Sequence, residues 1–378
     1  MRARITWILT LGCVLSSGNA RADEAAGTWS GDVELRGNYY WERSTRVVAP
    51  EASMRLEAPN GTRLTARYLA DAITSASIAA GTLVDVRFTE LRHQITVGAG
   101  QGFDVGAERL EVDASTTFST EPDYQSLSFS LTGALALDDR ATVLRLGALY
   151  LHDEVGKVLR GADRTEPGGR DLSDRGNQGA LDALVLSASW DQVVTRTLVA
   201  TLGYDLGYNV GLQSNVYRTV SVDGTPQTER HPDVRWRHTA HGRVAWHLPS
   251  TGTTLWLGHR AYLDSWRIAA LGPELRVYQA LDDRFVIRAR WRYYAQTPAF
   301  FWRAQYTGAP RYFSADPKMS GFRSHLLGLA AALRLDALAD GPFDWLSAAS
   351  VDVSFDHVWS TSRFGDGVIA QAGLRAPF

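Results

Sequence analysis

The stretch VRWRHTAHGRVAWHL (residues 234–248) alternates between apolar and polar or charged side chains along most of its length. One parity holds Trp236, Ala240, Val244, Trp246 and Leu248, and the other holds Arg235, Arg237, His241, Arg243 and His247. As a β-strand it would have one apolar face and one basic face. Trp236 and Trp246 are ten residues apart. At a rise of about 3.3 Å per residue and a tilt near 40°, that separation covers about 25 Å, the height of the apolar band of a membrane barrel.

The same period of two recurs along the chain in sixteen segments of strand length. They lie at 31–42, 48–58, 62–71, 86–98, 104–118, 124–137, 141–153, 181–190, 196–210, 234–248, 253–266, 273–281, 284–296, 322–335, 347–359 and 367–378. After the N-terminal apolar run, no segment approaches the roughly 18 to 20 apolar residues of a transmembrane helix. We therefore predict an all-β fold, a single transmembrane antiparallel β-barrel of about sixteen strands. Fourteen strands is the alternative, if the first two segments belong to a plug.

The lengths of the connections indicate a topology. Short connections follow even-numbered segments, and two of them repeat the sequence LDDR, at 137–140 and 281–284, which predicts a recurring turn. The longer connections all follow odd-numbered segments: 72–85, 154–180, 211–233 and 297–321. Bacterial outer-membrane barrels show this asymmetry, with short periplasmic turns and longer extracellular loops. The pattern predicts a barrel in the outer membrane, in contact with its lipid, with both chain ends in the periplasm.

Two of the long loops differ in composition. Loop 154–180 is polar and rich in glycine and charge, so we expect it to be exposed and mobile. Loop 297–321 carries too much aromatic surface to be left in water, and we expect it to fold over or into the barrel mouth as a constriction or ligand platform. The residues that carry this expectation are Phe300, Phe301, Trp302, Tyr306, Tyr312 and Phe313.

The N-terminus has the features of a secretory signal peptide. Arg2 and Arg4 precede the apolar run ITWILTLGCVL, and ARA at 20–22 offers a small-residue cleavage site. We predict a signal peptide over 1–22 and the barrel over 23–378. A lipoprotein signal ending at Cys13 is the alternative. Cys13 is the only cysteine, so the mature chain would have no disulfide and no cysteine metal site.

Composition and motifs exclude several classes of function. A formal net charge of −2 over 378 residues leaves no basic excess to neutralise the phosphates of a nucleic acid. The Ser and His of SHL (324–326) fall on opposite strand faces, as do the Asp and His of SFDH (354–357), so neither pair supplies a catalytic triad. No glycine-rich loop carries the residues of a phosphate cradle. We expect no catalysis, no metal and no cofactor.

The parity opposite the apolar face would line the lumen, and it is unusually charged. Candidate pore residues are Arg235, Arg237, Arg243, Arg260, Arg276, Arg288, Arg290, Arg292, Asp352 and Asp356. One hypothesis is a porin-like channel or transporter for small polar solutes, selected as anions by these arginines. The other is a closed scaffold or interaction barrel in the cell envelope, in which carboxylates pair with the arginines and fill the lumen.

The last segment, VIAQAGLRAPF (368–378), ends on Phe378 after strict alternation. It resembles the last strand of bacterial outer-membrane barrels, which the barrel assembly machinery reads. The resemblance implies that Phe378 is an assembly signal and that this machinery is a partner.

Several longer stretches resemble one family of bacterial outer-membrane proteins catalogued as a domain of unknown function. The block YLADAITSASIAAGTLVDVRFTELRHQITVG (68–98) is similar to the Asp-x-Ile-Ser-x-Ala-Ser block of that family and the arginine-containing strand after it. Further similarity lies in LGHRAYLDSWRIAALGPELRVYQAL (257–281) and RYFSADPKMSGFRSHLLGL (311–329). The resemblance implies a barrel and brings no activity with it.

Overall fold

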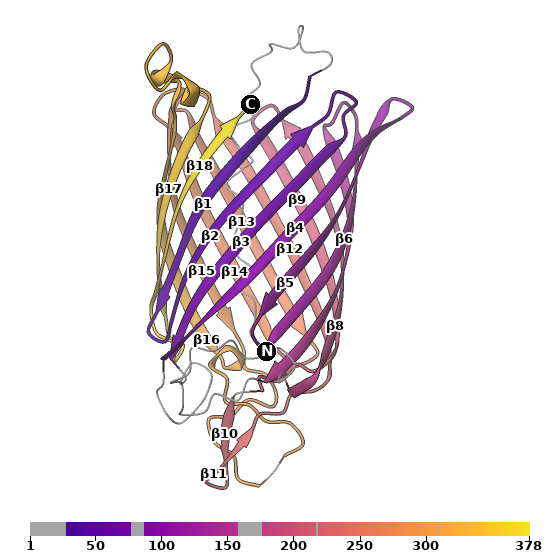
Figure 1. Cartoon of the computed structure of the whole chain (residues 1–378), viewed down its shortest axis with the longest axis vertical. Helices are drawn as coiled ribbons and strands as arrows, with labels where there is room; N and C mark the ends of the chain where they lie inside the picture. Colours follow the sequence, from indigo (N-terminus) through magenta and orange to yellow (C-terminus); the bar gives the residue numbers. More distant parts are fainter. Residues whose placement is uncertain (1–27, 77–86, 158–175, 217, 309) are drawn as a thin grey trace.

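The computed structural model describes residues 28–76, 87–157, 176–216, 218–308 and 310–378. Within these residues, sixteen antiparallel strands form one closed barrel (Figure 1). The prediction of sixteen strands is confirmed, and the alternative of fourteen is wrong because the first two segments are barrel strands. The signal peptide over 1–22, Cys13 and the middle of loops 72–85 and 154–180 lie outside the described residues.

The barrel strands follow one another round the wall in chain order. They are β1 (Ser30–Glu42), β2 (Thr45–Glu57), β3 (Arg63–Ala76), β4 (Arg87–Val105), β5 (Glu108–Glu121), β6 (Tyr124–Leu137), β7 (Thr142–Lys157), β8 (Gly176–Thr195), β9 (Leu198–Gly211), β12 (Val234–Leu248), β13 (Thr253–Asp264), β14 (Ala269–Ala280), β15 (Phe285–Gln296), β16 (Phe322–Arg334), β17 (Ser350–Ser360) and β18 (Gly367–Pro377). Two short strands, β10 (Thr219–Val222) and β11 (Thr225–Thr228), pair only with each other.

The barrel closes where β1 pairs with β18, from Asp32 opposite Pro377 to Glu42 opposite Gly367. One residue beyond this ladder, Gly31 and Phe378 exchange both backbone hydrogen bonds, each at 2.9 Å. Closure pairs the two strands that would otherwise be sheet edges, which is what a sheet in lipid requires. The last residue of the chain is therefore part of the seam.

The alternation of the sequence becomes an apolar outside and a polar inside. Leu146 and Leu329 are 69% and 64% exposed on the outer surface. A continuous apolar surface of this kind would be unfavourable in contact with water. The opposite parity carries the charged side chains inward. A closed antiparallel barrel with this outer surface is a transmembrane barrel of the outer-membrane type.

Among the described residues, no helix is long and apolar enough to cross a membrane.

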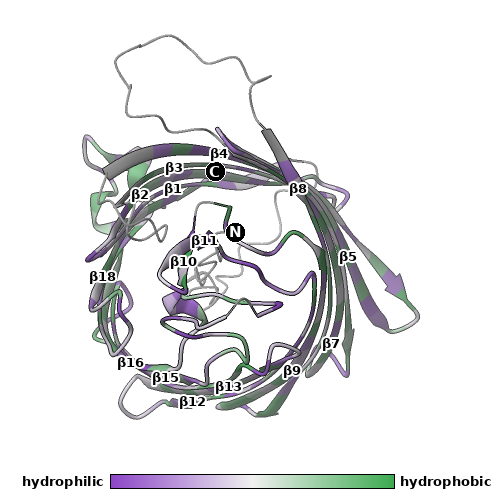
Figure 2. Ribbon diagram, turned by 90° about the horizontal axis from the view of Figure 1, so that it is seen from below, coloured by the Kyte–Doolittle hydropathy of each residue, from purple (hydrophilic) through white to green (hydrophobic). Residues whose placement is uncertain are grey.

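The two ends of the barrel differ. The described parts of the long loops, with β10 and β11, lie at the lower end in Figure 1, which we call the loop end. The other end, the turn end, has short connections and one exception to the predicted sorting, 335–349 after β16, which contains the 3-10 helices η3 (Asp336–Leu338) and η4 (Asp344–Leu346). Seen along the barrel, the described parts of loops 212–233 and 297–321 lie within its outline (Figure 2). The two views together place these loops across the mouth.

The repeated LDDR does not form the same turn twice. At 138–140 all three residues have positive φ, between 52° and 69°. In the second copy, the Asp282 side chain accepts hydrogen bonds from the backbone N–H groups of Arg284 and Phe285. The prediction of one recurring turn is wrong, because Asp can either adopt the left-handed conformation or cap a turn with its side chain.

Candidate pore lining and cap

The lumen wall formed by β1 to β5 with β17 and β18 is electrically balanced. Each of five inward arginines in this wall has a carboxylate oxygen within 4 Å. The pairs are Arg36 with Glu34 and Asp352, Arg63 with Glu111 and Asp113, Arg67 with Glu51, Arg92 with Asp71, and Arg375 with Asp32. Of the candidate pore residues, Asp352 belongs here. Its role in the described structure is to hold Arg36 at 3.0 Å.

The wall formed by β14 and β15 is basic. Arg276 lies opposite Arg290 in the β14–β15 ladder, with Arg288 and Arg292 on the same face. Glu274 contacts both Arg276 and Arg290, at 2.6 and 2.8 Å, and Asp356 lies 3.6 Å from Arg290. Four guanidinium groups thus lie on one inward face, and these contacts of Glu274 and Asp356 involve two of them. We call this patch of four arginines the basic wall, and a surplus of positive charge in a lumen attracts anions.

Two glycines on the inner face let charges pair across an intervening strand. Gly328 lies between Arg290 and Asp356 in neighbouring registers, and Gly373 lies between Arg36 and Asp352. A Cβ added at Gly328 would collide with the Asp356 carboxylate, and one at Gly373 would lie 2.6 Å from Asp352 Oδ1. The missing side chains make room for ion pairs between strands that are not adjacent.

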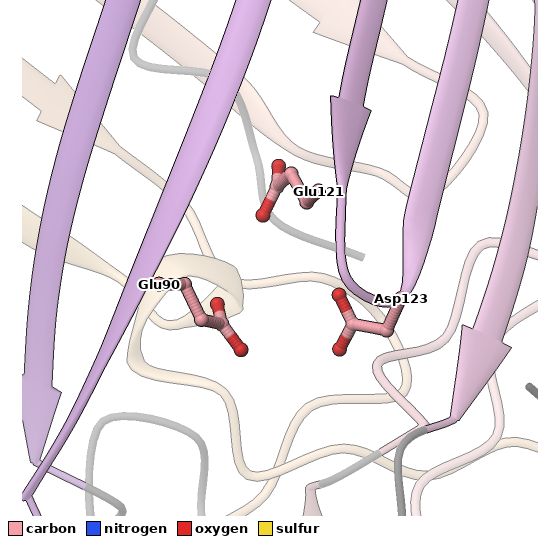
Figure 3. Close-up of side chains that lie close together, drawn as sticks. All are labelled: Glu90, Glu121 and Asp123. Carbon is pink, nitrogen blue, oxygen red and sulfur yellow. The ribbon is translucent and has the colours of Figure 1, made fainter. Parts of the chain in front are cut away.

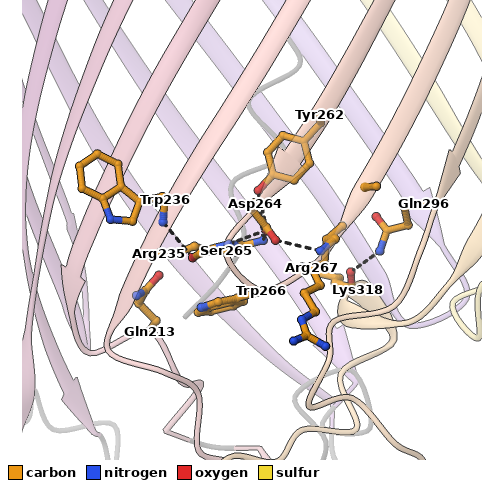
Figure 4. Close-up of polar contacts among 12 residues, drawn as sticks. Gln213, Arg235, Trp236, Tyr262, Asp264, Ser265, Trp266, Arg267, Gln296 and Lys318 are labelled. Carbon is orange, nitrogen blue, oxygen red and sulfur yellow. Dashed lines mark hydrogen bonds and ion pairs between the residues drawn. The ribbon is translucent and has the colours of Figure 1, made fainter.

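The candidate arginines of β12 and β13 lie in different surroundings. Arg235 is buried at the loop end, where its Nε donates to Asp264 Oδ2 at 2.8 Å and its guanidinium lies 4.0 Å above the Trp266 ring (Figure 4). Arg243 donates to Thr201 Oγ1 at 2.9 Å, and Arg260 faces the lumen with more exposure. Among the described residues, Arg237 has no carboxylate oxygen within 4 Å, and its buried Nε has no hydrogen-bond partner.

The loops across the mouth fold into a compact unit that we call the cap, the described residues of 212–233 and 297–321. Two apolar clusters stabilise it: the hairpin core of Val220, Val222, Tyr306 and Phe313 within the cap, and the rim core of Trp266, Ile268, Ala299 and Phe301 between the cap and the barrel. The rim core includes residues of the β13–β14 turn, and the Gln296 side chain donates to Lys318 O and Ser320 O. The cap is therefore packed onto the barrel rim.

The six aromatic candidates of loop 297–321 have different positions within the cap. Phe301, Tyr306 and Phe313 are buried in its two cores. Trp302 and Tyr312 are partly buried and pack against the rim core. Phe300 is 48% exposed, with Arg267 Cζ at 5.9 Å from its ring. The structure places this loop across the mouth and uses most of its aromatic surface to hold the cap together. The role of these six aromatic residues as a constriction or ligand platform stays a prediction.

A buried polar centre joins the two halves of the cap. Glu229 accepts hydrogen bonds from the Asn215 N–H and the Ser314 hydroxyl, both at 2.7 Å, and its Oε1 lies 3.4 Å from His231 Nε2. Burial alone would raise the pKa of Glu229, but His231, the positive charge of Arg218 and the Asn215 N–H together hold this pKa at about 2. The carboxylate is thus ionised throughout the physiological range.

The polar centre also has a second ion pair. Arg218 and Asp316 form a buried ion pair between the two loops. The hydroxyl of Tyr306 accepts a hydrogen bond from the Ser314 N–H at 2.9 Å, and burial raises the pKa of this phenol. Arg218, Glu229 and Asp316 are not predicted from the sequence, because no local pattern brings residues 85 or more positions apart to one point.

A third feature that sequence reasoning missed is an acidic cluster near the loop end (Figure 3). Oxygens of the buried Glu90, Glu121 and Asp123 lie within 4.8 Å of one another. Glu90 is on β4, whereas Glu121 and Asp123 come from the β5–β6 hairpin, so the cluster depends on strand register. All three residues take part in further interactions.

The geometry defines the class of protein: a closed transmembrane barrel with one balanced wall, one basic wall and a packed cap. The chain belongs to the family of proteins of unknown function DUF3570, whose model matches residues 79–340. This confirms the family resemblance noted in the sequence. No curated protein matches the chain.

The solved structures that are similar to this barrel have low sequence identity to the chain. The outer membrane protein OprD from Pseudomonas aeruginosa is 8% identical, with a TM-score of 0.45 over 93% of this chain and 94% of that one. A BenF-like porin from Pseudomonas fluorescens Pf-5 is also 8% identical, with a TM-score of 0.46 over 93% and 98%. The siderophore receptor PirA from Acinetobacter baumannii is 12% identical, with a TM-score of 0.47 over 88% and 52%. The function proposed below rests on the side chains of this barrel.

Proposed function

We propose that the protein is a porin-like channel of the bacterial outer membrane for small polar solutes, with a preference for anions. The observation that carries this proposal is the basic wall, in which Arg276, Arg288, Arg290 and Arg292 lie on one inward face and Glu274 and Asp356 contact two of them. A barrel of sixteen strands is wider than its own side chains can fill. Solutes would enter at the loop end, pass the cap and meet the basic wall.

The second candidate function is a closed scaffold without transport. Two observations favour it: the ion pairs of the balanced wall and the packing of the cap across the mouth. In this reading the arginines stabilise the wall and the cap closes it. The two functions differ in one measurable property, the passage of ions.

Reconstitution in planar bilayers tests the channel. The protein, with folding checked by heat-modifiable migration on gels, should give discrete conductance steps, because a water-filled bore carries ions past fixed charges. An empty bilayer and a heat-unfolded sample are the controls. Folded protein that stays electrically silent would favour the scaffold.

We also propose that residues 1–22 direct export and that Phe378 is read by the barrel assembly machinery. Phe378 is 62% exposed on the seam and forms two backbone hydrogen bonds with Gly31. Deleting Phe378 should lower the amount of folded barrel in cells several-fold, because the last strand loses its terminal contact during insertion. The yield after refolding in detergent should change little. Equal losses in cells and in detergent would show that Phe378 acts only through stability.

A further inference from the structure

We propose that Arg288, with Arg276 and Tyr278 of the neighbouring strand, forms a binding site for an oxyanion group, a carboxylate or a phosphate, on the basic wall. This inference rests on the proposed function, since the bound group would belong to a solute in the lumen. It adds to a general preference for anions a specific site that can be saturated.

Within the described part of the chain, Arg288 differs from most inward arginines because it has no ion-pair partner. It is 7% exposed, yet among the described residues no carboxylate oxygen lies within 4 Å of its guanidinium, and its buried Nε has no hydrogen-bond partner. By contrast, Arg290 on the same strand is held by Glu274 and Asp356. A buried guanidinium without a counter-ion is costly, because desolvation is not repaid by attraction. An anionic ligand would supply the missing partner.

The neighbours of Arg288 add donors and space. Tyr278 lies directly opposite Arg288 in the β14–β15 ladder, and its hydroxyl is a further donor for an oxyanion. On the other side, the registers place Ala330 and then Ser354 next to Arg288, both with short side chains. The site is therefore framed by a donor on one side and by small residues on the other.

Two contacts fix the orientation of Arg276, which would bind the same oxyanion. Its Nε donates to Glu274 at 2.6 Å, and its guanidinium lies 4.2 Å from the Trp256 ring, two contacts that fix its plane. Its Nη2 is buried and has no hydrogen-bond partner. Guanidinium groups present paired N–H donors that match the two oxygens of a carboxylate or phosphate. Arg276 thus offers a preorganised donor beside Arg288 for one oxyanion.

Asp356 is the internal competitor of such a ligand. It is 3% exposed, its Oδ2 faces Arg290 at 3.6 Å, and its Oδ1 has no hydrogen-bond partner. Its negative charge would repel an anion bound at Arg288. Removing this charge should therefore strengthen binding, a result that a purely structural role of Arg288 would not produce.

Isothermal titration calorimetry on the folded, detergent-solubilised protein tests the site. Inorganic phosphate and succinate are titrated separately at constant ionic strength, and the tighter ligand identifies the preferred oxyanion. We expect saturable binding of at least one of them. Arg288→Gln should weaken it about tenfold or more, and Arg288→Lys should also weaken it, because a lysine lacks the paired donors. Tyr278→Phe, which leaves the charges unchanged, should weaken it about threefold.

Two further variants complete the test. Asp356→Asn should strengthen binding about threefold, and Arg243→Gln, a lumen arginine outside the site, should leave the affinity within about twofold. Folded wild-type protein that binds neither ligand, or an Arg288→Gln variant that binds like wild type, would overturn the proposal. Conductance steps without saturable binding would remove the site and leave the channel. Saturable binding by a folded barrel that gives no conductance would support the site and contradict the channel.

Discussion

Replacing Glu229 with glutamine should open the cap to protease. The change removes the negative charge that accepts hydrogen bonds from Asn215 and Ser314 and attracts Arg218, and breaking a buried charge network in this way costs about 3–5 kcal/mol. Because local opening governs cleavage, trypsin should cut after Arg230 at least about 100 times faster than in the wild type. Mass spectrometry of the released fragments gives the rate at this bond.

Asp233→Asn is the matched control, because Asp233 is an exposed acid of the same loop whose side chain makes no contact in the polar centre. Its cleavage rate should stay near that of the wild type. If Glu229→Gln and Asp233→Asn are cleaved equally slowly, the carboxylate does not hold the cap.

The same group predicts how the cap responds to acid. The pKa of Glu229, about 2 in the folded cap, lies below its ordinary value of 4.5, so its contribution to stability is fully present above pH 4.5 and is lost as pH falls toward 2. The protection factor of segment 218–231, which is the ratio of the intrinsic to the observed exchange rate at each pH, should therefore stay high from pH 7 to 5 and fall below that. Glu229→Gln should show no such step. Protection that is lost already between pH 7 and 5 would contradict this assignment.

The second large effect is expected from Arg237→Gln combined with Arg288→Gln. These two arginines have no carboxylate within 4 Å among the described residues, so the double variant removes lumen charge without leaving a paired carboxylate alone. A unit charge 4 Å from an ion is worth about 1 kcal/mol even in water, so the ratio of chloride to potassium permeability should fall about fivefold or more. Zero-current potentials in a salt gradient measure this ratio.

The control also removes two positive charges, but from arginines outside the lumen. Arg46 and Arg323 are exposed at the loop ends of β2 and β16, on the outward parity of their strands. Arg46→Gln combined with Arg323→Gln should leave the permeability ratio nearly unchanged. A similar fall in both double variants would mean that net charge, rather than the lumen wall, sets selectivity.

The structure also shows why Arg290 is a poor choice for such a test. From the sequence, Arg288, Arg290 and Arg292 are equivalent members of one inward face. In the barrel, Arg290 contacts Glu274 and Asp356, so its removal would take the arginine partner from the buried Asp356 and one of two arginine partners from Glu274. The role of each arginine depends on which carboxylates the register places beside it, and that information is absent from the strand itself.

The presence of the strands and the direction of their side chains could be predicted from the sequence. One strand face contacts lipid and the other contacts the lumen, so apolar and polar residues alternate with a period of two. Strand ends were less predictable. The predicted strands 86–98 and 104–118 leave AGQG (99–102) between them as a connection, but β4 continues to Val105 and the chain turns at Gly106, which has a φ of 67°. Gly100 and Gly102 lie under the Asp113 and Arg109 side chains, so they serve close packing within the strand. β7 and β8 likewise extend to Lys157 and from Gly176, where polar residues continue the hairpin without apolar alternation.

The cap could be predicted only in outline. The aromatic content of loop 297–321 indicated that it would not extend into water, and the structure places it on the rim. The hairpin of β10 and β11, which supplies Val220 and Val222 to the hairpin core, had no clear pattern because its strands have four residues each. The partner loop and the buried Glu229 follow from contacts between distant residues, which a local pattern does not contain.

The most direct test of the channel is the zero-current potential of the wild-type protein in a planar bilayer that separates two potassium chloride solutions differing tenfold in concentration. The basic wall predicts discrete conductance and a potential whose sign reports chloride as the more permeant ion. Discrete conductance with potassium as the more permeant ion, or no conductance from protein verified as folded, would contradict the proposed function.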